Sequence, residues 1–285
     1  MDLTIVAIPA FLFLLVLEAV VARRQRRRIQ EPRDAATSLS LGVGSLVIGA
    51  AWKTAQAGLY VTVHEHALVD LGDGPWALAG AVIAVDLAYY WFHRLHHEVR
   101  VLWASHVPHH SSQRYNLATA LRQSWTPFTG LPFYLPLALV FSPLQIATAY
   151  GINLLYQFWI HTELIDRLGP LETVFNTPSH HRVHHGANVE YLDRNYGGIL
   201  ILWDRWFGSF EPERAPVRYG LTKNITTFNP VTVAFHEWVD VLRDALTARS
   251  LRDALGFLLR PPGWRPDGKG ATATDLKRLA SPLTA

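Results

Sequence analysis

An apolar run near the N-terminus restricts the fold of this chain more than any other feature. Residues 3–22 read LTIVAIPAFLFLLVLEAVVA, which is about the length a helix needs to cross the hydrocarbon core of a bilayer. The basic stretch RRQRRR follows directly, at residues 23–28. A signal peptide carries its positive charge before the apolar run, so we expect a transmembrane helix whose C-terminal end lies in the cytoplasm.

Further apolar runs predict more membrane helices. Residues 39–63 and 76–92 predict a second and a third, and residues 126–160 form a longer run without Lys or Arg. Ser142 and Pro143 lie near its middle and favour a turn, so we expect a hairpin of two helices there. Every basic cluster then lies on the cytoplasmic side. The sequence therefore predicts an all-α integral membrane protein with about four to five transmembrane helices and a cytoplasmic helical cap.

The chain divides into three parts on this interpretation. Residues 1–75 hold the N-terminal transmembrane helices and a basic cytoplasmic linker. Residues 76–215 hold most of the histidines and form the expected catalytic domain. Residues 216–285 are expected to be cytoplasmic helices and a tail, with helical apolar spacing at 231–246 and 251–259.

Histidine is concentrated in three short groups on the expected cytoplasmic side. The chain has 14 histidines and no cysteine, so a transition-metal site must use His, Asp or Glu. Spacings of three and four residues place side chains on one side of a helical turn, as a metal cluster requires. One group has the pattern HxxxH and two have the pattern HxxHH. Their members are His93 and His97; His106, His109 and His110; and His181, His184 and His185.

The local signals around the two HxxHH groups differ. Thr177 can cap a short helix in which Pro178 takes the first position and Gly186 marks the end. Pro108 would break a helix begun upstream. We therefore expect a helix that starts at Pro108, with His106 just before its first turn. Eight imidazoles are too many for one tetrahedral zinc and suit two metals. The carboxylates expected to orient the rings are Glu98, Glu163, Asp193 and Asp204. No role is assigned to His96 or His180.

Several longer phrases resemble one known family. They are YYWFHRLHHEVRVLWASHVPHHSSQRYNLATALRQSW, QFWIHTELI, NTPSHHRVHHG and NYGGILILWDRWFGSF, which lie between residues 89 and 210. Together they are similar to the fatty acid hydroxylase and sterol desaturase superfamily, in its alkylglycerol monooxygenase-like bacterial branch. The resemblance implies that the eight histidines bind metal, with His161 as a further ligand. It also points to Glu98, Asn116 and Asn195 as residues that assist catalysis or shape the site.

The same resemblance implies a function. It predicts a non-haem di-iron oxygenase, in a bacterial inner membrane, that hydroxylates or desaturates a C–H bond of a fatty acyl, sterol or ether lipid. Such an enzyme would use two iron ions, O2 as co-substrate, and electrons from a reductase partner, with a pterin as an alternative donor. We expect a lipid substrate taken from the bilayer and no nucleic-acid partner.

Two other functions fit a histidine cluster. A zinc-dependent membrane hydrolase would need an open coordination position and a general base, for which Glu98 and Glu163 are candidates. A non-catalytic metal-binding or transport protein would place its ligands near the membrane midplane in broken helices. In all three cases the ligating imidazoles must be neutral, so we expect metal occupancy to fall below about pH 6.

Overall fold

A computed structural model of the chain describes residues 3–69 and 71–280. Within these ranges the protein is helical, and the only extended pairing is two isolated bridges, Phe175 with Leu200 and Gly186 with Tyr219. This confirms the all-helical expectation. The helices are α1 (Leu3–Val6), α2 (Ile8–Arg24), α3 (Pro32–His64), α4 (Pro75–Glu98), α5 (Arg100–His110), α6 (Leu117–Ala120), α7 (Leu131–Tyr134), α8 (Pro143–Trp159), α9 (Pro178–His184), α10 (Leu202–Trp206), α11 (Pro230–Leu246), α12 (Leu251–Leu259) and α13 (Ala273–Ala280), with the 3-10 turns η1 (Pro127–Gly130), η2 (Leu135–Leu139), η3 (Gly169–Thr173) and η4 (Val189–Tyr191).

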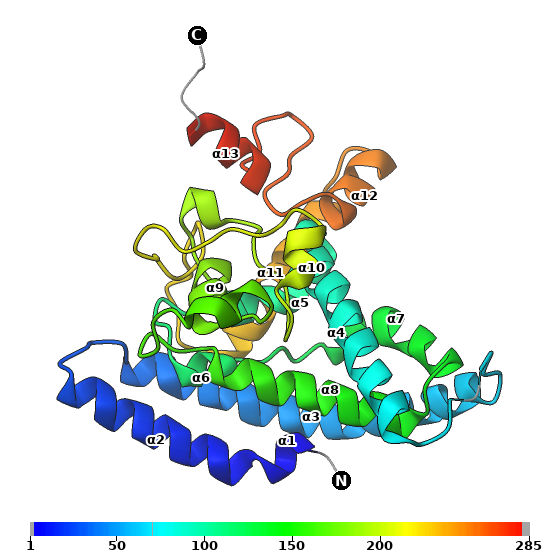
Figure 1. Cartoon of the computed structure of the whole chain (residues 1–285). Helices are drawn as coiled ribbons and strands as arrows, with labels where there is room; N and C mark the ends of the chain where they lie inside the picture. Colours follow the sequence, from blue (N-terminus) through cyan, green and yellow to red (C-terminus); the bar gives the residue numbers. More distant parts are fainter. Residues whose placement is uncertain (1–2, 70, 281–285) are drawn as a thin grey trace.

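The long apolar helices form one layer of the molecule. Figure 1 shows α2, α3 and α8 running side by side, with α4 crossing from this layer toward the histidine-bearing helices α5 and α9. Among the described residues, α3 and α4 are long and apolar enough to cross a membrane. Helices α2 and α8 have 17 residues each. The aromatic rings of Phe11 and Phe158 stack at 4.1 Å and join these two shorter helices.

The run at 126–160 does not form the expected pair of helices. The turn lies where it was predicted, because Ser142 caps α8 and accepts a hydrogen bond from the backbone N–H of Gln145. The arm before it is broken into η1, α7 and η2. Three prolines divide this arm, at positions 127, 132 and 136, and each removes a backbone N–H that a continuous helix would use.

The main apolar core lies where α3, α4 and α8 meet the broken arm. It contains Val85 of α4, Tyr134 of α7 and Ile146 of α8, all buried.

Two buried carboxylates connect this layer to the rest of the molecule. Glu18 of α2 accepts hydrogen bonds from the N–H of Leu117 and the hydroxyl of Thr162. This buried carboxylate thereby holds α2 against α6 and the segment after α8.

The second buried carboxylate is Asp34, at the start of α3. It forms an ion pair of 3.2 Å with Arg122, and the two side chains are 10% and 2% exposed. Arg122 also donates to the carbonyl of Pro108, near the end of α5. Since breaking a buried ion pair leaves an uncompensated charge, this contact fixes α5 against the N-terminal end of α3.

The C-terminal helices pack on α5. Arg100 of α5 forms ion pairs with Glu237 and Asp244 of α11, at 2.8 and 2.7 Å. Helix α11 contacts α3 and α12 as well. The two helices predicted at 231–246 and 251–259 therefore match α11 and α12 closely, and α11 supports one of the histidine-bearing helices.

Candidate metal centre

The structure brings nine histidines together from four segments of the chain. They form two groups, and within each group the nitrogen atoms that could bind a metal lie within 4.8 Å of one another. All nine were predicted as ligands. The first group contains His93, His97, His106, His110 and His184, and the second contains His109, His161, His181 and His185.

The two HxxHH segments contribute to the groups in opposite ways. His106 and His110 of α5 belong to the first group, and His109 belongs to the second. In the other segment, His181 and His185 belong to the second group and His184 to the first. Positions i and i+4 share a helix face and position i+3 points partly away from it, so each segment serves both groups.

The expected start of the helix at Pro108 is wrong. Helix α5 begins eight residues earlier, at Arg100, and Pro108 lies inside its last turn. The helix ends two residues later, so the proline interrupts the pattern only near its end. The carbonyl of Pro108, which the end of the helix leaves without an intrahelical partner, accepts hydrogen bonds from Ser111 and Arg122. The segment around Pro178 forms a short helix as predicted, with that proline at the first position of α9. Thr177 lies at the N-cap position, but its side chain does not cap the helix and donates to Glu172 instead.

The ring nitrogens of neighbouring histidines lie at separations that suit either a hydrogen bond or a shared metal ion. In the first group, the Nε2 atom of His106 lies 3.0 Å from the Nε2 atoms of both His93 and His110. In the second, the Nε2 atom of His161 lies 3.2 Å from that of His109 and 3.0 Å from that of His181. Two nitrogens bound to one ion at about 2.1 Å each would also lie roughly 3 Å apart.

Backbone contacts fix which nitrogen carries the hydrogen in three of these rings. The Nδ1 atoms of His93, His184 and His161 lie 2.7–3.0 Å from the carbonyls of Tyr196, Arg194 and Gln157. A carbonyl only accepts, so Nδ1 donates, and in the neutral ring Nε2 keeps its lone pair. The lone pairs of His93 and His184 thus face the first group from two helices, and the lone pair of His161 faces the second. This donor set fits a bound cation in each.

The rings resist protonation. Burial lowers the pKa of His161 to about 4. Burial and the neighbouring imidazoles lower the pKa values of the α5 and α9 histidines well below their usual range. These rings are therefore neutral at neutral pH, which is the form that binds a metal. Protons should also begin to compete with a metal at a lower pH than they would for imidazoles with an ordinary pKa.

Unpaired polar atoms provide a second sign of a missing partner. Among the described residues, the buried Nε2 atoms of His97 and His185 have no hydrogen bond; the Nδ1 atoms of His109 and His181 are also unpaired, but these two rings face the second group through Nε2. An unpaired buried polar atom costs stability, so such atoms cluster where a ligand is expected. The two groups together fit two metal ions held by nitrogen ligands.

Asp204 and Asp86 hold the loop that orients His93. The carboxylate of Asp204 accepts hydrogen bonds of 2.7 Å from the N–H groups of Tyr196 and Gly197. Asp86 accepts from the backbone of Ile199 and from the indole of Trp203. Burial raises the pKa of Asp204 to about 6. The sequence placed Asp204 among the residues that orient the rings, and its contacts agree with that position.

The other carboxylates named from the sequence differ in position. An oxygen of Asp193 lies 3.7 Å from Nδ1 of His97. Glu98 pairs instead with Arg94 at 2.9 Å, and the two side chains are 36% and 26% exposed. Glu163 lies among neither histidine group, and burial raises its pKa.

Asn116 and Asn195 have structural contacts that account for them. Asn116 caps α6 and donates to the carbonyl of Ile29. Asn195 has a positive φ of 56°, and its amide bonds to backbone groups of His180 and Glu211. The structure thus does not bring Glu98, Asn116 or Asn195 into either histidine group. Their part in catalysis stays a prediction, and these contacts favour support of the surrounding loops.

The two unassigned histidines lie outside the groups. His96 is buried and its ring contacts the carbonyl of Phe92 and the hydroxyl of Thr129. His180 belongs to neither group and lines a separate pocket. Sequence reasoning missed Tyr115, whose fully buried ring covers His161 and His185 at 5.7 and 5.1 Å. A single tyrosine carries no spacing signal that could have revealed this role.

Comparison with known proteins gives the family of the chain. A family model described as fatty acid hydroxylase matches residues 78–209, which contain every histidine of the two groups. The human alkylglycerol monooxygenase is 45% identical over 267 residues, and the ornithine lipid hydroxylase OlsE of Rhizobium tropici is 31% identical over 170 residues. Human lathosterol oxidase is 30% identical over 171 residues. The chain belongs to the fatty acid hydroxylase and sterol desaturase superfamily.

The matches differ in how much of each protein they cover. The match to the human alkylglycerol monooxygenase covers 91% of this chain and 59% of that protein. The matches to OlsE and to lathosterol oxidase cover 58% and 53% of this chain, and 51% and 52% of those proteins. No solved structure matches the chain. The chain thus spans little more than half the length of these relatives.

Proposed function

We propose that this protein is a membrane-bound non-haem di-iron oxygenase that acts on a C–H bond of a lipid. The observation that carries the proposal is the convergence of nine histidines into two buried groups with facing lone pairs. Imidazole binds iron, zinc, copper and nickel alike, so the ligands do not name the metal. The names of the relatives favour iron, because all three describe oxidation of a lipid or sterol.

The reaction requires a redox centre. The hydrogen of an unactivated lipid C–H bond is not acidic, so acid–base side chains do not remove it. Two bound iron ions would supply the required electron-transfer chemistry with O2. In a hydroxylation, one oxygen atom of O2 enters the C–H bond and the other leaves as water, with two electrons and two protons from a donor. We propose a reductase partner or a pterin as that donor.

The chain's own residues would hold and orient this centre. His93, His97, His106, His110 and His184 would bind one ion, and His109, His161, His181 and His185 the other. The carbonyls that accept from Nδ1 of His93, His184 and His161 keep the Nε2 atoms of these rings directed inward. Loss of such a hydrogen bond to a ligating histidine commonly changes metal affinity 10- to 100-fold. Buried aromatic rings such as Tyr115 keep water away from the second group.

We also propose the membrane arrangement predicted from the sequence. Helices α3 and α4 span the bilayer, and α2, the broken arm and α8 complete about four to five crossings. His93 and His97 lie in the last two turns of α4, so the metal centre is at one membrane face. The basic run after α2 supports the cytoplasmic face of a bacterial inner membrane.

The alternative functions have less support from the geometry. A hydrolase needs a general base beside the metal, yet Glu98 and Glu163 lie in neither group. A transport path needs ligands at the membrane midplane, whereas these lie at the end of α4 and in the short helices beyond it.

Isotope labelling tests the reaction class. The protein would be incubated in nanodiscs with an alkylglycerol ether, a reductant and 18O2, and the products analysed by mass spectrometry. We expect one 18O atom in the oxidised product. Label that enters only from H2(18)O, independently of reductant, would overturn the proposal in favour of hydrolysis. An ornithine lipid and a sterol serve as parallel substrates.

A further inference from the structure

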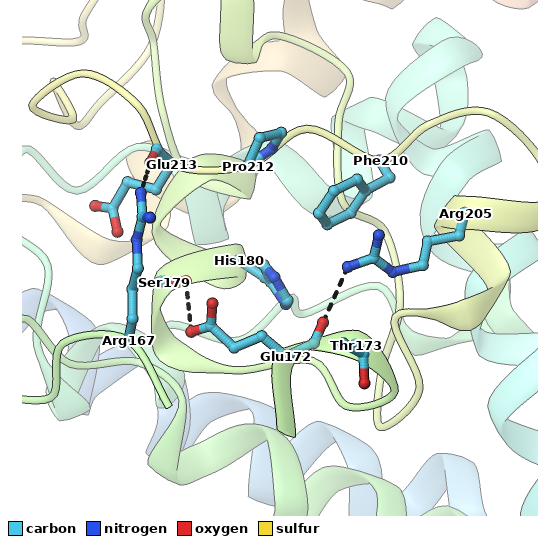
Figure 2. Close-up of a pocket in the computed structure, with 9 residues that line it drawn as sticks. All are labelled: Arg167, Glu172, Thr173, Ser179, His180, Arg205, Phe210, Pro212 and Glu213. Carbon is cyan, nitrogen blue, oxygen red and sulfur yellow. Dashed lines mark hydrogen bonds between the residues drawn. The ribbon is translucent and has the colours of Figure 1, made fainter. Parts of the chain in front are cut away.

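A pocket beside α9 is separate from the two histidine groups. It lies between η3, α9 and α10, has a volume of about 190 Å³, and includes Arg167, Glu172, His180 and Arg205 in its lining. Figure 2 shows the His180 ring between Glu172 and Phe210, with the Arg205 side chain at one side of the space. The volume is smaller than that of a typical drug-sized site, so a small polar group suits it.

The charges of the pocket favour an anion. Both carboxylate oxygens of Glu213 accept from Arg182, at 2.9 and 2.7 Å. Oε1 of Glu172 accepts from the Leu168 N–H and from the hydroxyls of Thr177 and Ser179. The charge of Glu213 is therefore balanced by Arg182, whereas Glu172 keeps its negative charge because its partners are neutral donors. The guanidinium groups of Arg167, which also donates to the carbonyl of Glu213, and Arg205 outnumber this one charge, so positive charge is in excess at the pocket.

Arg205 is held in place for binding. One Nη donates to the carbonyl of Glu172 at 3.0 Å, and the guanidinium lies 3.8 Å from the centre of the Phe210 ring. In the described part of the chain, this is the only hydrogen bond found for the Arg205 side chain, so its other guanidinium N–H groups remain for a ligand. A fixed guanidinium plane loses little entropy when it binds a phosphate with two hydrogen bonds.

His180 supplies the second observation. Its side chain is only 2% exposed, and its Nδ1 atom has no hydrogen-bond partner among residues 3–69 and 71–280. A buried nitrogen left unpaired costs stability, and a ligand in the pocket would supply the missing contact. The pocket thus combines an unpaired buried donor or acceptor with two cationic groups.

The rim of the pocket connects it to a candidate membrane helix. Trp206, next to Arg205, is 67% exposed, and Phe207 is also exposed. The Phe207 ring packs on Trp91 of α4 at 4.9 Å. Aromatic side chains are enriched at the level of lipid headgroups. Apolar side chains of η3 and of the segment after it are exposed as well: Leu171, Val174 and Phe175.

We propose that this pocket binds a phosphate group carried by the headgroup of a membrane lipid. The phosphate accepts from Arg205, Arg167 and His180, and the lipid chains pass over the aromatic rim toward α4. The inference rests on the proposed function only in that a lipid reaches this face of the protein. It adds a headgroup site that is separate from the metal centre.

Calorimetry on the full chain in neutral detergent tests the site. The probes are dihexanoyl phosphatidic acid, inorganic phosphate and dihexanoylglycerol, each below its micelle-forming concentration. We expect phosphatidic acid to bind, inorganic phosphate to bind at least about tenfold more weakly, and dihexanoylglycerol to show no saturable binding. Arg205→Gln should weaken phosphatidic acid binding at least about tenfold, and Arg205→Lys should weaken it less because one charge remains.

The control is Arg243→Gln, which removes an exposed arginine of α11 and should leave binding unchanged. Equal binding of phosphatidic acid by the Arg205→Gln and unaltered proteins would overturn the site. Equal affinity for inorganic phosphate and phosphatidic acid would overturn the proposal that a lipid carries the bound phosphate. The assay needs neither O2 nor turnover, so absent oxygenase activity with intact, Arg205-dependent binding would contradict the proposed function alone.

Discussion

The two HxxHH segments share one spelling but differ in structure. The first ends α5, an eleven-residue helix with Pro108 inside its last turn, and the second forms most of the seven-residue α9, which begins with Pro178. Each nevertheless supplies a pair of histidines four apart to one group and a single histidine to the other. The comparison teaches that the i, i+3, i+4 spacing determines the distribution of ligands, whatever precedes it along the helix. Helix packing then decides which group receives the pair.

The largest expected effect comes from removing the last histidine of each HxxHH segment. His110→Ala removes the last ligand of the first segment, and His185→Ala removes the last ligand of the second. Each variant should lose metal from its own group and keep the other ion, so metal content should fall from about two to about one per chain. Activity should fall at least about 100-fold in both variants. Loss of a metal ligand should reduce activity more than loss of a hydrogen bond to a ligand, which commonly costs 10- to 100-fold.

Metal analysis and turnover measure this outcome in the same sample. His236→Ala, on α11 and outside both groups, is the matched control and should retain both ions. Loss of both ions in either ligand variant, with the fold intact by circular dichroism, would contradict two separately held metals.

A smaller loss of metal affinity should follow when the contacts that orient a ligand of the first group are weakened. Asp204→Asn removes one of the acceptors that hold the backbone of Tyr196 and Gly197, and the Tyr196 carbonyl orients His93. We expect metal affinity of the first group to fall 10- to 100-fold while the second is unchanged. Competition with a chelator would measure both affinities. The exposed Asp240→Asn should change neither, and an equal loss in the two groups would argue for general unfolding.

The pH dependence should be weaker than ordinary imidazoles would give. Burial lowers the pKa of His161 to about 4, and it lowers the α5 and α9 values well below their usual range. Unfolded imidazoles protonate near pH 6.5, so stability from these neutral rings is present above that pH and is lost as the pH falls toward the folded values. Metal content should therefore be unchanged at pH 6 and fall only toward about pH 5 or below. Half the metal released at pH 6 would contradict the burial of the ligands.

The smallest effect is expected at Glu98. Its ion pair with Arg94 is partly exposed, and such pairs contribute roughly 0–1 kcal/mol. Glu98→Gln should leave metal content and turnover within about twofold of the unaltered protein. A loss above about tenfold, with both ions bound, would restore the role in catalysis that the resemblance suggested.

The ligand set could be predicted because its signal is local. Three- and four-residue spacings report a shared helix face without knowledge of the fold, and Pro178 and Gly186 mark the ends of α9 by their backbone chemistry alone. The turn at Ser142 was predictable for the same reason. The assignment of His106 to one group and His109 to the other was not, because it depends on how α4, α5 and α9 pack.

The failures come from long-range contacts and from proline. Arg122 and Asp34 are 88 positions apart, yet their buried pair sets where α5 ends, so Pro108 could lie inside a helix that began at Arg100. The broken arm before α8 has a membrane-like composition, but its three prolines prevent a continuous helix. Tyr115 and the Tyr196 carbonyl act through contacts that no sequence spacing encodes.

The most direct test of the central claim is the metal content of the purified full chain, with Mössbauer and X-ray absorption spectra on the same sample. The account predicts about two irons per chain after anaerobic loading, each with a nitrogen-dominated ligand shell. Well-folded protein that binds no metal, or that holds zinc tightly and refuses iron, would contradict it.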